Sequence, residues 1–303
     1  MIDTISSYLK VDDIKDSRYF ERVPTLLKKV STKQNSNGLI YHTGLFENLY
    51  ISVSQLGISI NGSLTKFYHQ NNYCDLTRKQ VELSIKRIEE YLNLNIGDSN
   101  CKRVDIAHNF IMNEDTSNYY YFLGTSKYFN RFKQPNSIYY NNHQKTKLFY
   151  DKIDECKNKN VEISPILNLR NLLRYELRFL NRINKQLNSN VILNSLFNED
   201  IYMNMIDIWI TEYNSINKNK LFMPTETELT PKTAKEFLLC ALIEKVGLNE
   251  VNELTDQWNN SFTNSKAKSR FNKELNSLKG MTIESDLIKE LDIKVNNIKE
   301  FYR

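Results

Sequence analysis

The sequence predicts an α+β protein in which a largely antiparallel sheet with covering helices is followed by an all-helical C-terminal module. Two observations predict this class. Short runs of alternating apolar and polar residues, separated by turn residues, recur through residues 38–180. From about residue 191 onward, apolar residues recur at helical spacing instead. The length of 303 residues favours two domains, which we place at residues 1–185 and 186–303.

The first predicted strands form an antiparallel meander. Gly57 and the pair Asn61-Gly62 are turn residues, and the pair is a strong hairpin signal. These turns help to separate strand-like runs at residues 38–44, 48–54, 58–60 and 63–68. The short turns between the runs predict that successive strands pair with each other.

A helix is expected next, because apolar residues between positions 76 and 96 recur every three or four residues. Asp75 or Thr77 would cap its N-terminus. Strand character returns at residues 101–112, and residues 116–132 are expected to form an aromatic, helical connection.

A second hairpin is expected from residues 137–140 and 147–150. The strand that follows, residues 172–180, alternates so that its apolar residues share one face. Arg174, Glu176 and Arg178 then share the other face, which is entirely charged. In the C-terminal module, residues 224–231 are a candidate joint. The helices expected there lie at residues 201–216, 231–246, 249–258 and 266–278.

Composition and charge narrow the class of protein. Hydrophobic residues make up 40% of the chain and charged residues 25%, as in soluble globular proteins. No signal-like start or membrane-length apolar segment is present, and the four cysteines lack metal-site spacing, so we expect a reducing cytoplasm. Residues 1–185 carry 27 Lys and Arg against 19 Asp and Glu, whereas residues 186–303 carry 14 against 17. The first part would therefore attract a polyanion.

One tyrosine stands among charged residues in a strand-like run. Within residues 147–155, Tyr150 is surrounded by two lysines and three carboxylates. A phenol is a poor nucleophile at its ordinary pKa of about 10, so an enzyme that attacks with it must supply cations or a metal. Tyr150 is therefore a candidate nucleophile. The alternative is a half-buried strand tyrosine without a catalytic role.

Two carboxylates on separate strands are candidate metal ligands. Asp105 lies in the strand at residues 101–112, and Glu176 lies in the strand at residues 172–180. Carboxylates on one face of adjacent strands can converge on a divalent cation, and oxygen ligands suit Mg²⁺ or Mn²⁺. The basic residues that would neutralise phosphate charge are Arg103, Lys152, Arg174 and Arg178. The alternative is an ordinary ion pair at Asp105 and a salt-bridge ladder on a solvated face.

Other catalytic templates fit the sequence less well. No His-x-His pair occurs among the four histidines, and strand alternation places His108 on the face opposite Asp105. The motifs GxGxxG, GxxxxGK(S/T), GxSxG and HExxH do not occur. Their absence argues against nucleotide-driven motors, hydrolases of the nucleophile-elbow type and zinc proteases.

Four blocks, taken in order, resemble the replication initiators of the filamentous-phage gene II type. The later three also resemble the plasmid rolling-circle initiators called Rep-trans proteins. The blocks are Gly-Ser-Leu-Thr-Lys-Phe-Tyr-His-Gln-Asn-Asn at residues 62–72, Arg-Val-Asp-Ile-Ala-His-Asn-Phe at 103–110, Leu-Phe-Tyr-Asp-Lys-Ile-Asp-Glu at 148–155 and Leu-Leu-Arg-Tyr-Glu-Leu-Arg at 172–178. The resemblance covers about residues 40–185.

The resemblance implies an HUH-like sheet domain that nicks and rejoins DNA in rolling-circle replication. Tyr150 would cut one strand at the origin, keep the 5′ phosphate as a phosphotyrosine ester and leave a 3′ hydroxyl for host polymerase. The same chemistry in reverse would close the displaced strand without ATP. The implied partners are origin DNA, single-stranded or extruded as a hairpin, and the host helicase and polymerase, in the cytoplasm of a bacterial host cell.

The resemblance also implies roles for other residues. Asp105 is the first choice for a metal ligand and Glu176 the second, while Asp151 matches the acidic residue that follows the tyrosine in Rep-trans proteins. Lys152 matches a shared tyrosine-x-lysine-x-x-glutamate pattern and joins Tyr150 as a catalytic candidate. The nucleic-acid-binding candidates are Lys66, Asn72, Arg103, Arg174 and Arg178.

Three points are left open by the sequence. Tyr139 and Tyr140 are candidates for the family's usual second tyrosine, and the family often has glycine at the position of Gln70. The chain could instead be a non-catalytic DNA-binding replication regulator of the same fold, or a relaxase or transposase of related chemistry, although the latter would need a histidine pair. A basic segment near the C-terminus could contact duplex DNA or a helicase, or form a solvated helix face. It comprises Lys266, Lys268, Arg270 and Lys273.

Overall fold

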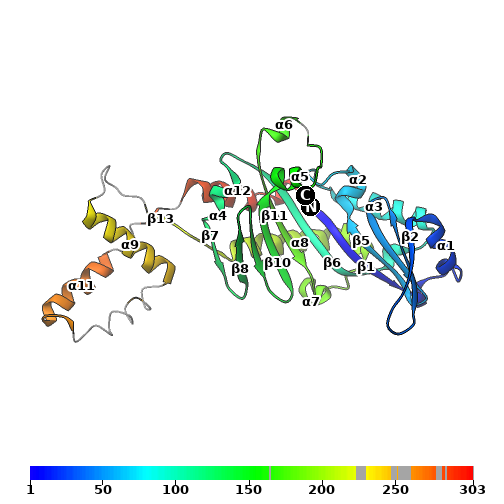
Figure 1. Cartoon of the computed structure of the whole chain (residues 1–303), viewed down its shortest axis with the longest axis horizontal. Helices are drawn as coiled ribbons and strands as arrows, with labels where there is room; N and C mark the ends of the chain where they lie inside the picture. The colour runs from blue at the N-terminus through cyan, green and yellow to red at the C-terminus, as the bar shows by residue number, and fades with distance from the viewer. Residues whose placement is uncertain are drawn as a thin grey trace.

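The computed structural model describes residues 1–163, 165–222, 230–246, 251, 261–277, 282–283 and 285–302. Its main feature is an antiparallel sheet of ten strands in the order β2-β3-β4-β5-β1-β6-β11-β10-β9-β8 (Figure 1). The strands are β1 (Ile2–Lys10), β2 (Lys28–Gln34), β3 (Ile40–Phe46), β4 (Leu49–Ser54), β5 (Gly57–Ser63), β6 (Asn100–Met112), β8 (Asn130–Gln134), β9 (Ser137–Asn141), β10 (Lys145–Asp151) and β11 (Asn171–Phe179). This arrangement confirms the predicted α+β class with a largely antiparallel sheet.

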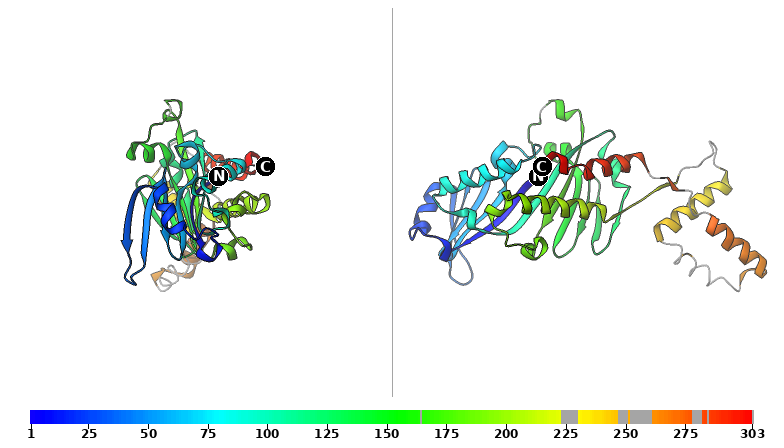
Figure 2. Two further views of the ribbon diagram at one scale, coloured as in Figure 1. Left: turned by 90° about the vertical axis from the view of Figure 1, so that its right-hand side faces the viewer. Right: turned by 180° about the vertical axis from the view of Figure 1, so that it is seen from behind.

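Three helices cover one face of this sheet. They are α3 (Arg78–Leu92), α8 (Glu199–Asn214) and α12 (Asp286–Asn296), which lie in front of the strands in the right-hand view of Figure 2. Trp209 of α8 packs against Tyr175 of β11 with ring centroids 4.4 Å apart, and both side chains are fully buried. The central strands carry no long helix on their other face, where α5 (Lys152–Asn158) lies at one end of the strands (Figure 1).

The shorter helices lie at the edges of the sheet and in the connections. They are α1 (Tyr19–Leu26), α2 (Leu64–His69), α4 (Thr116–Tyr120), α6 (Pro165–Asn168), α7 (Ile183–Leu187) and α13 (Lys299–Tyr302), with single 3-10 turns at Val11–Asp13, Ile96–Asp98 and Leu193–Phe197. No helix in the described ranges has both the length and the apolar character needed to cross a membrane.

The C-terminal part of the chain contributes to the same core as the sheet. Buried residues of α8 and α12 belong to one hydrophobic cluster with the strands, so the core continues past residue 185, where we place the domain boundary. This part also contains short strands. β12 (Ile216–Lys218) pairs with β7 (Leu123–Ser126), and β13 (Leu221–Phe222) pairs with β14 (Thr282–Ile283).

The remaining helices of this part lie apart from the sheet. They are α9 (Pro231–Val246) and α11 (Ser265–Ser277), and both match predicted helices (Figure 1). The helix expected at residues 249–258 and the joint expected at residues 224–231 fall almost entirely outside the described residues.

Several predicted elements are confirmed. The helix expected between positions 76 and 96 is α3, and Thr77 caps it in a reciprocal capping box with Gln80. The strand at residues 101–112 is β6, and the second hairpin is the antiparallel pair β9–β10. The alternating strand at residues 172–180 is β11.

Two predictions at the end of the meander are wrong. The run at residues 63–68 is not a strand but the start of α2, because Ser63 accepts a hydrogen bond from the backbone N–H of Lys66 and caps the helix. The pair Asn61-Gly62 is not a hairpin turn but lies within β5. Gly62 has φ +154°, and a Cβ there would come within 2.8 Å of Leu49 Cδ2, so close packing explains this glycine.

The connection expected to be helical at residues 116–132 is mostly extended. Only Thr116–Tyr120 is helical, and the strands β7 and β8 follow it. Aromatic residues occur throughout this segment, and such residues favour strands when a neighbouring strand is available. Here β7 pairs with β12 and β8 pairs with β9, so tertiary pairing decides the outcome.

Trp209→Ala tests whether α8 is part of the sheet core. Removing a fully buried indole that packs on Tyr175 should lower the free energy of unfolding by about 3–5 kcal/mol, measured by chemical denaturation. Phe301→Ala is the control, because Phe301 is 82% exposed and should change stability little. A loss below about 1 kcal/mol for Trp209→Ala would mean that α8 folds separately from the sheet.

Candidate active site

Strand pairing places most of the predicted site residues on one face of the sheet. Tyr150 of β10 lies opposite Arg174 of β11, and Arg174 lies opposite Asn109 of β6. Asp105 lies opposite Arg178 in the same pair of strands. Directly paired residues point to the same side of a sheet, and so do residues two positions apart in one strand. The face that carries Tyr150 therefore also carries the charged residues of β6 and β11.

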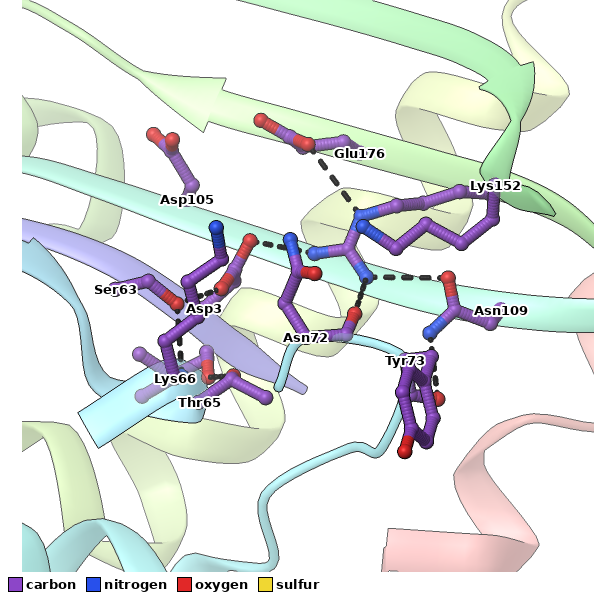
Figure 3. A network of polar contacts seen from close by, with 12 residues as sticks. Asp3, Ser63, Thr65, Lys66, Asn72, Tyr73, Asp105, Asn109, Lys152 and Glu176 are labelled. Atoms are coloured by element: carbon purple, nitrogen blue, oxygen red, sulfur yellow. Dashed lines mark hydrogen bonds and ion pairs between the residues drawn. The ribbon is translucent and has the colours of Figure 1, made fainter. Parts of the chain in front are cut away.

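Arg174 is the centre of a buried polar network on this face. Its side chain is 1% exposed, and its Nη2 lies 2.5 Å from Asp3 Oδ2. Its Nη1 donates to Asn109 Oδ1 at 3.1 Å and to the carbonyl oxygen of Asn72 at 3.3 Å, while its Nε lies 3.5 Å from Glu176 Oε2. Figure 3 shows these partners converging from β1, β6, β11 and the loop after α2. The guanidinium thus joins four separate segments.

The two predicted acidic ligands lie near each other. Arg178 Nε is 2.7 Å from Glu176 Oε1 and 3.9 Å from Asp105 Oδ2, so one nitrogen contacts both carboxylates. Asp105 is 1% exposed and accepts hydrogen bonds from Arg103 Nε at 2.7 Å and Nη2 at 2.5 Å. Burial raises the pKa of Asp105 to about 7 against the opposing Arg103 hydrogen bond, and the charge of Glu176 adds to the rise.

Tyr150 and Lys152 meet beside this network. Lys152 begins α5, is fully buried, and places its Nζ 5.8 Å from the centroid of the Tyr150 ring and 2.7 Å from Glu155 Oε2. Burial raises the pKa of the Tyr150 phenol well above its usual value of 10.0, with Arg174 opposing the rise and Glu176 and Glu155 adding to it. Burial and the charge of Arg174 lower the pKa of Lys152. Tyr150 is therefore a neutral phenol in the free protein.

A cavity of about 270 Å³ opens beside Tyr150 on this face. Its lining includes Tyr139, Leu148, Tyr150, Glu155, Lys159 and Arg178. Aromatic, acidic and basic side chains thus line the cavity together with the phenol.

Asp151 does not join the other predicted metal ligands. It lies opposite Leu173, so its side chain leaves β10 on the other side from Tyr150. There its Oδ1 caps α5 by accepting from the backbone N–H of Asp154, and its Oδ2 accepts from Thr116 Oγ1 at 2.8 Å. The Asp151 carboxylate therefore has other contacts than those of Asp105 and Glu176, although Asp151 also lines the cavity beside Tyr150. The described residues contain no group of three or more metal-binding side chains.

Lys147 and His108 also lie on the opposite face. Lys147 does not face the phenol but is buried with its Nζ 2.8 Å from Glu212 Oε2 of α8. His108 lies opposite Tyr175, as strand alternation predicts, and its Nδ1 is 2.6 Å from Asp75 Oδ2.

The remaining predicted residues lie around the network. Asn72 is buried, and its Oδ1 has no hydrogen-bond partner in the structure. Lys66 is half-buried and lies beside Asp3 and Ser63 in Figure 3. Gln70, at the position where the resembling family often has glycine, has φ 62° and ends α2. A left-handed backbone gives a conformational reason for glycine there.

The two candidate second tyrosines point to opposite faces. Tyr140 is fully buried, and its hydroxyl lies 2.8 Å from the carbonyl oxygen of Gly124. Tyr139 lies opposite Leu148 and lines the cavity beside Tyr150. Of the two, only Tyr139 shares the face and the cavity of Tyr150.

Sequence reasoning missed Asp3 and Asn109. Asn109 lies within the block at residues 103–110, but the sequence predicted no role for it. Asp3 is the one carboxylate in strand β1 and lies between apolar and neutral residues at its buried start, and this mismatch was the available signal.

The oxygen donors of this face fit a hard divalent cation. Magnesium commonly uses one or two protein carboxylates and keeps several waters, so Asp105 and Glu176 are a sufficient pair. The raised pKa of Asp105 supports this fit, because it reflects a buried carboxylate whose charge its partners compensate incompletely. For a cation to bind, Arg103 and Arg178 would have to give up some of their hydrogen bonds and ion pairs with these carboxylate oxygens.

Arg174→Met tests the central role of the guanidinium. The substitution leaves Asp3 and Glu176 buried without their shared cation, so the free energy of unfolding should fall by about 3–5 kcal/mol in chemical denaturation. Arg182→Met, at an exposed position, is the matched control. Adding Asp3→Asn to Arg174→Met should recover part of the loss. Equal stability of Arg174→Met and the control would refute the role.

Comparison with known proteins adds one match. A family model that describes the N-terminal part of the phage gene II replication-associated protein matches residues 28–208 of the 303 residues. The matched segment contains β6, β10, β11 and α5, and it therefore includes Asp105, Tyr150 and Glu176. No curated protein matches the chain.

Proposed function

Because the chain belongs to the family of replication-associated proteins of the phage gene II type, we propose that it nicks and rejoins DNA at a replication origin to drive rolling-circle replication. The observation that carries the proposal is the position of Tyr150. The phenol lies at a cavity, on the same face as the Asp105–Glu176 pair and beside the cations of Arg174 and Lys152.

The proposed reaction is a transesterification. Tyr150 Oη attacks the phosphorus, the bond from phosphorus to the 3′ oxygen breaks, and the 5′ phosphate stays on the tyrosine as an ester. The phenol proton passes to a base, for which Glu155 is the candidate, because it lines the same cavity and its charge acts on the phenol. The leaving 3′ oxygen takes up a proton and becomes the primer. Attack on the ester by a later 3′ hydroxyl reverses these steps and joins the strand.

Basic residues of this face would stabilise the charge that develops on the phosphate. Arg174 already lowers the energy of the phenolate, because its charge opposes the rise in the pKa of Tyr150. Lys152 is a buried ammonium next to the same ring. Arg178 and Lys159 line the cavity and would contact flanking phosphates.

We further propose that Asp105 and Glu176 hold Mg²⁺ or Mn²⁺, which would polarise the scissile phosphate. Asp151 is left out of this proposed pair, because its carboxylate caps α5 and accepts from Thr116, although Asp151 also lines the cavity. Tyr139 is the better candidate for a second nucleophile, because it shares the cavity with Tyr150.

Tyr150→Phe tests the nucleophile. With supercoiled cognate replicon and magnesium, the parent should give relaxed product and a covalent protein–DNA adduct, and Tyr150→Phe should give neither, because it lacks the attacking oxygen. Tyr140→Phe is the control, since that hydroxyl is buried on the other face and bonded to carbonyl oxygens. Undiminished nicking by Tyr150→Phe would assign the reaction to another residue. Absence of nicking and adduct in the parent, with DNA binding retained, would favour the non-catalytic regulator.

Asp105→Asn and Glu176→Gln test the metal site by thermal unfolding. A cation bound only to the folded state at ten times its Kd should raise the Tm of the parent by about 2–3 °C. Each variant should lose this rise, because it removes one of two carboxylates. Asp151→Asn is the matched control and should keep it. A rise that persists in both Asp105→Asn and Glu176→Gln would place the ion elsewhere.

A further inference from the structure

The sheet register extends the active-site face to the edge strand β8. Phe132 of β8 lies opposite Tyr139 of β9, Tyr139 lies opposite Leu148 of β10, and Leu148 lies opposite Glu176 of β11. Residues paired in this way point to the same face. Phe132 and Tyr139 are therefore in one row with Glu176, and Tyr150 is two residues from that row along β10.

These two aromatic rings are unlike those on the other face. Phe132 is 58% exposed, and Tyr139 is half-buried at the cavity beside Tyr150. On the opposite face of the sheet, which α8 covers, Tyr140 of β9 and Phe149 of β10 are fully buried. Phe132 thus offers an exposed ring on an edge strand, in the same row as the half-buried ring of Tyr139.

Cations beside these rings can contact a polyanion. Arg178 and Lys159 line the cavity together with Tyr139. The turn before β8 adds a third aromatic residue, Tyr128, which is 81% exposed and has φ 66°. Lys127 Nζ lies 4.9 Å from the centroid of that ring. A bulky residue held exposed in a left-handed backbone conformation costs free energy, which points to a use outside the fold.

We propose that Phe132 and Tyr139 form a stacking surface for unpaired bases of single-stranded DNA, leading from the β8 edge to Tyr150. The rings lie on neighbouring strands, about 5 Å apart at the backbone, and offer adjacent surfaces to the bases. Arg178 and Lys159 at the cavity contact the phosphates of the same segment. Stacking tolerates any sequence, so this surface holds the strand near the nucleophile without reading it. The inference rests on the proposed function for the identity of the polymer.

Binding of a labelled, mixed-sequence single-stranded oligonucleotide to the full chain tests the surface. By fluorescence anisotropy, Phe132→Ala and Tyr139→Leu should each raise the Kd by about 5- to 150-fold, as loss of one stacked base does. Tyr139→Phe should bind like the parent, because it keeps the ring. Phe301→Ala is the matched control, since that exposed ring lies on α13, next to the Tyr302 that contacts His108 on the opposite face.

A 2-aminopurine base in the oligonucleotide gives a second readout that a folding defect would not imitate. Stacking on the parent should quench its fluorescence, and Phe132→Ala should remove the quenching at saturating protein while circular dichroism and Tm stay unchanged. In the nicking assay, Phe132→Ala should raise KM by more than it lowers kcat.

The outcomes separate this inference from the proposed function. Parental Kd and parental quenching in Phe132→Ala would overturn the stacking surface, even if Tyr150→Phe abolishes nicking. Tyr150→Phe should lose nicking but bind the oligonucleotide like the parent, because the substitution keeps the aromatic ring. A change of oligomeric state in Phe132→Ala without a change in DNA affinity would make the β8 edge a contact between two copies of the chain and would also overturn the inference.

Discussion

The contacts of the buried Arg174 guanidinium, at the centre of the sheet, are the interaction on which the face that carries Tyr150 depends. Charge that is removed from water is tolerated only when it is paired and hydrogen-bonded. Arg174 pairs with Asp3 and donates hydrogen bonds to Asn109 and to the carbonyl oxygen of Asn72, which come from different segments of the chain. Its Nε lies 3.5 Å from Glu176 and has no hydrogen-bond partner among the described residues. The strand order β1-β6-β11 and its register are therefore tied to one side chain. A slip of one residue would turn the arginine toward the aromatic core.

The requirement that buried charges be paired also determines how the charged groups around Tyr150 are arranged. Asp3 pairs with Arg174, and Glu155 pairs with Lys152. The Asp105–Arg103 and Glu176–Arg178 pairs complete the set. Each of these cations is thus already engaged by a carboxylate. In the proposed function, a phosphodiester would add negative charge to this face, and a divalent ion would compensate it.

Much of this face could be predicted from the sequence because strand alternation is a local rule. The alternation in β11 separates Arg174, Glu176 and Arg178 from the buried aromatic residues, and the structure keeps that separation. Asp3 could not be found in this way, because its partner is 171 residues away and alternation does not reveal which strands become neighbours. Asp151 is ambiguous in the sequence because an acidic residue after a strand fits both a ligand and a helix cap, and in the structure its carboxylate caps the N-terminus of α5.

The strand that carries the nucleophile is supported from behind by the C-terminal part of the chain. Leu148 and Tyr150 point toward the cavity, whereas Lys147 and Phe149 point toward α8. Lys147 Nζ is 2.8 Å from Glu212 Oε2, and the Phe149 ring lies 6.1 Å from that of Tyr213. The family match also runs into α8, since it ends at residue 208. The proposed attack of Tyr150 on phosphorus would need a rigid strand, and the packing that holds this strand extends past residue 185 through α8.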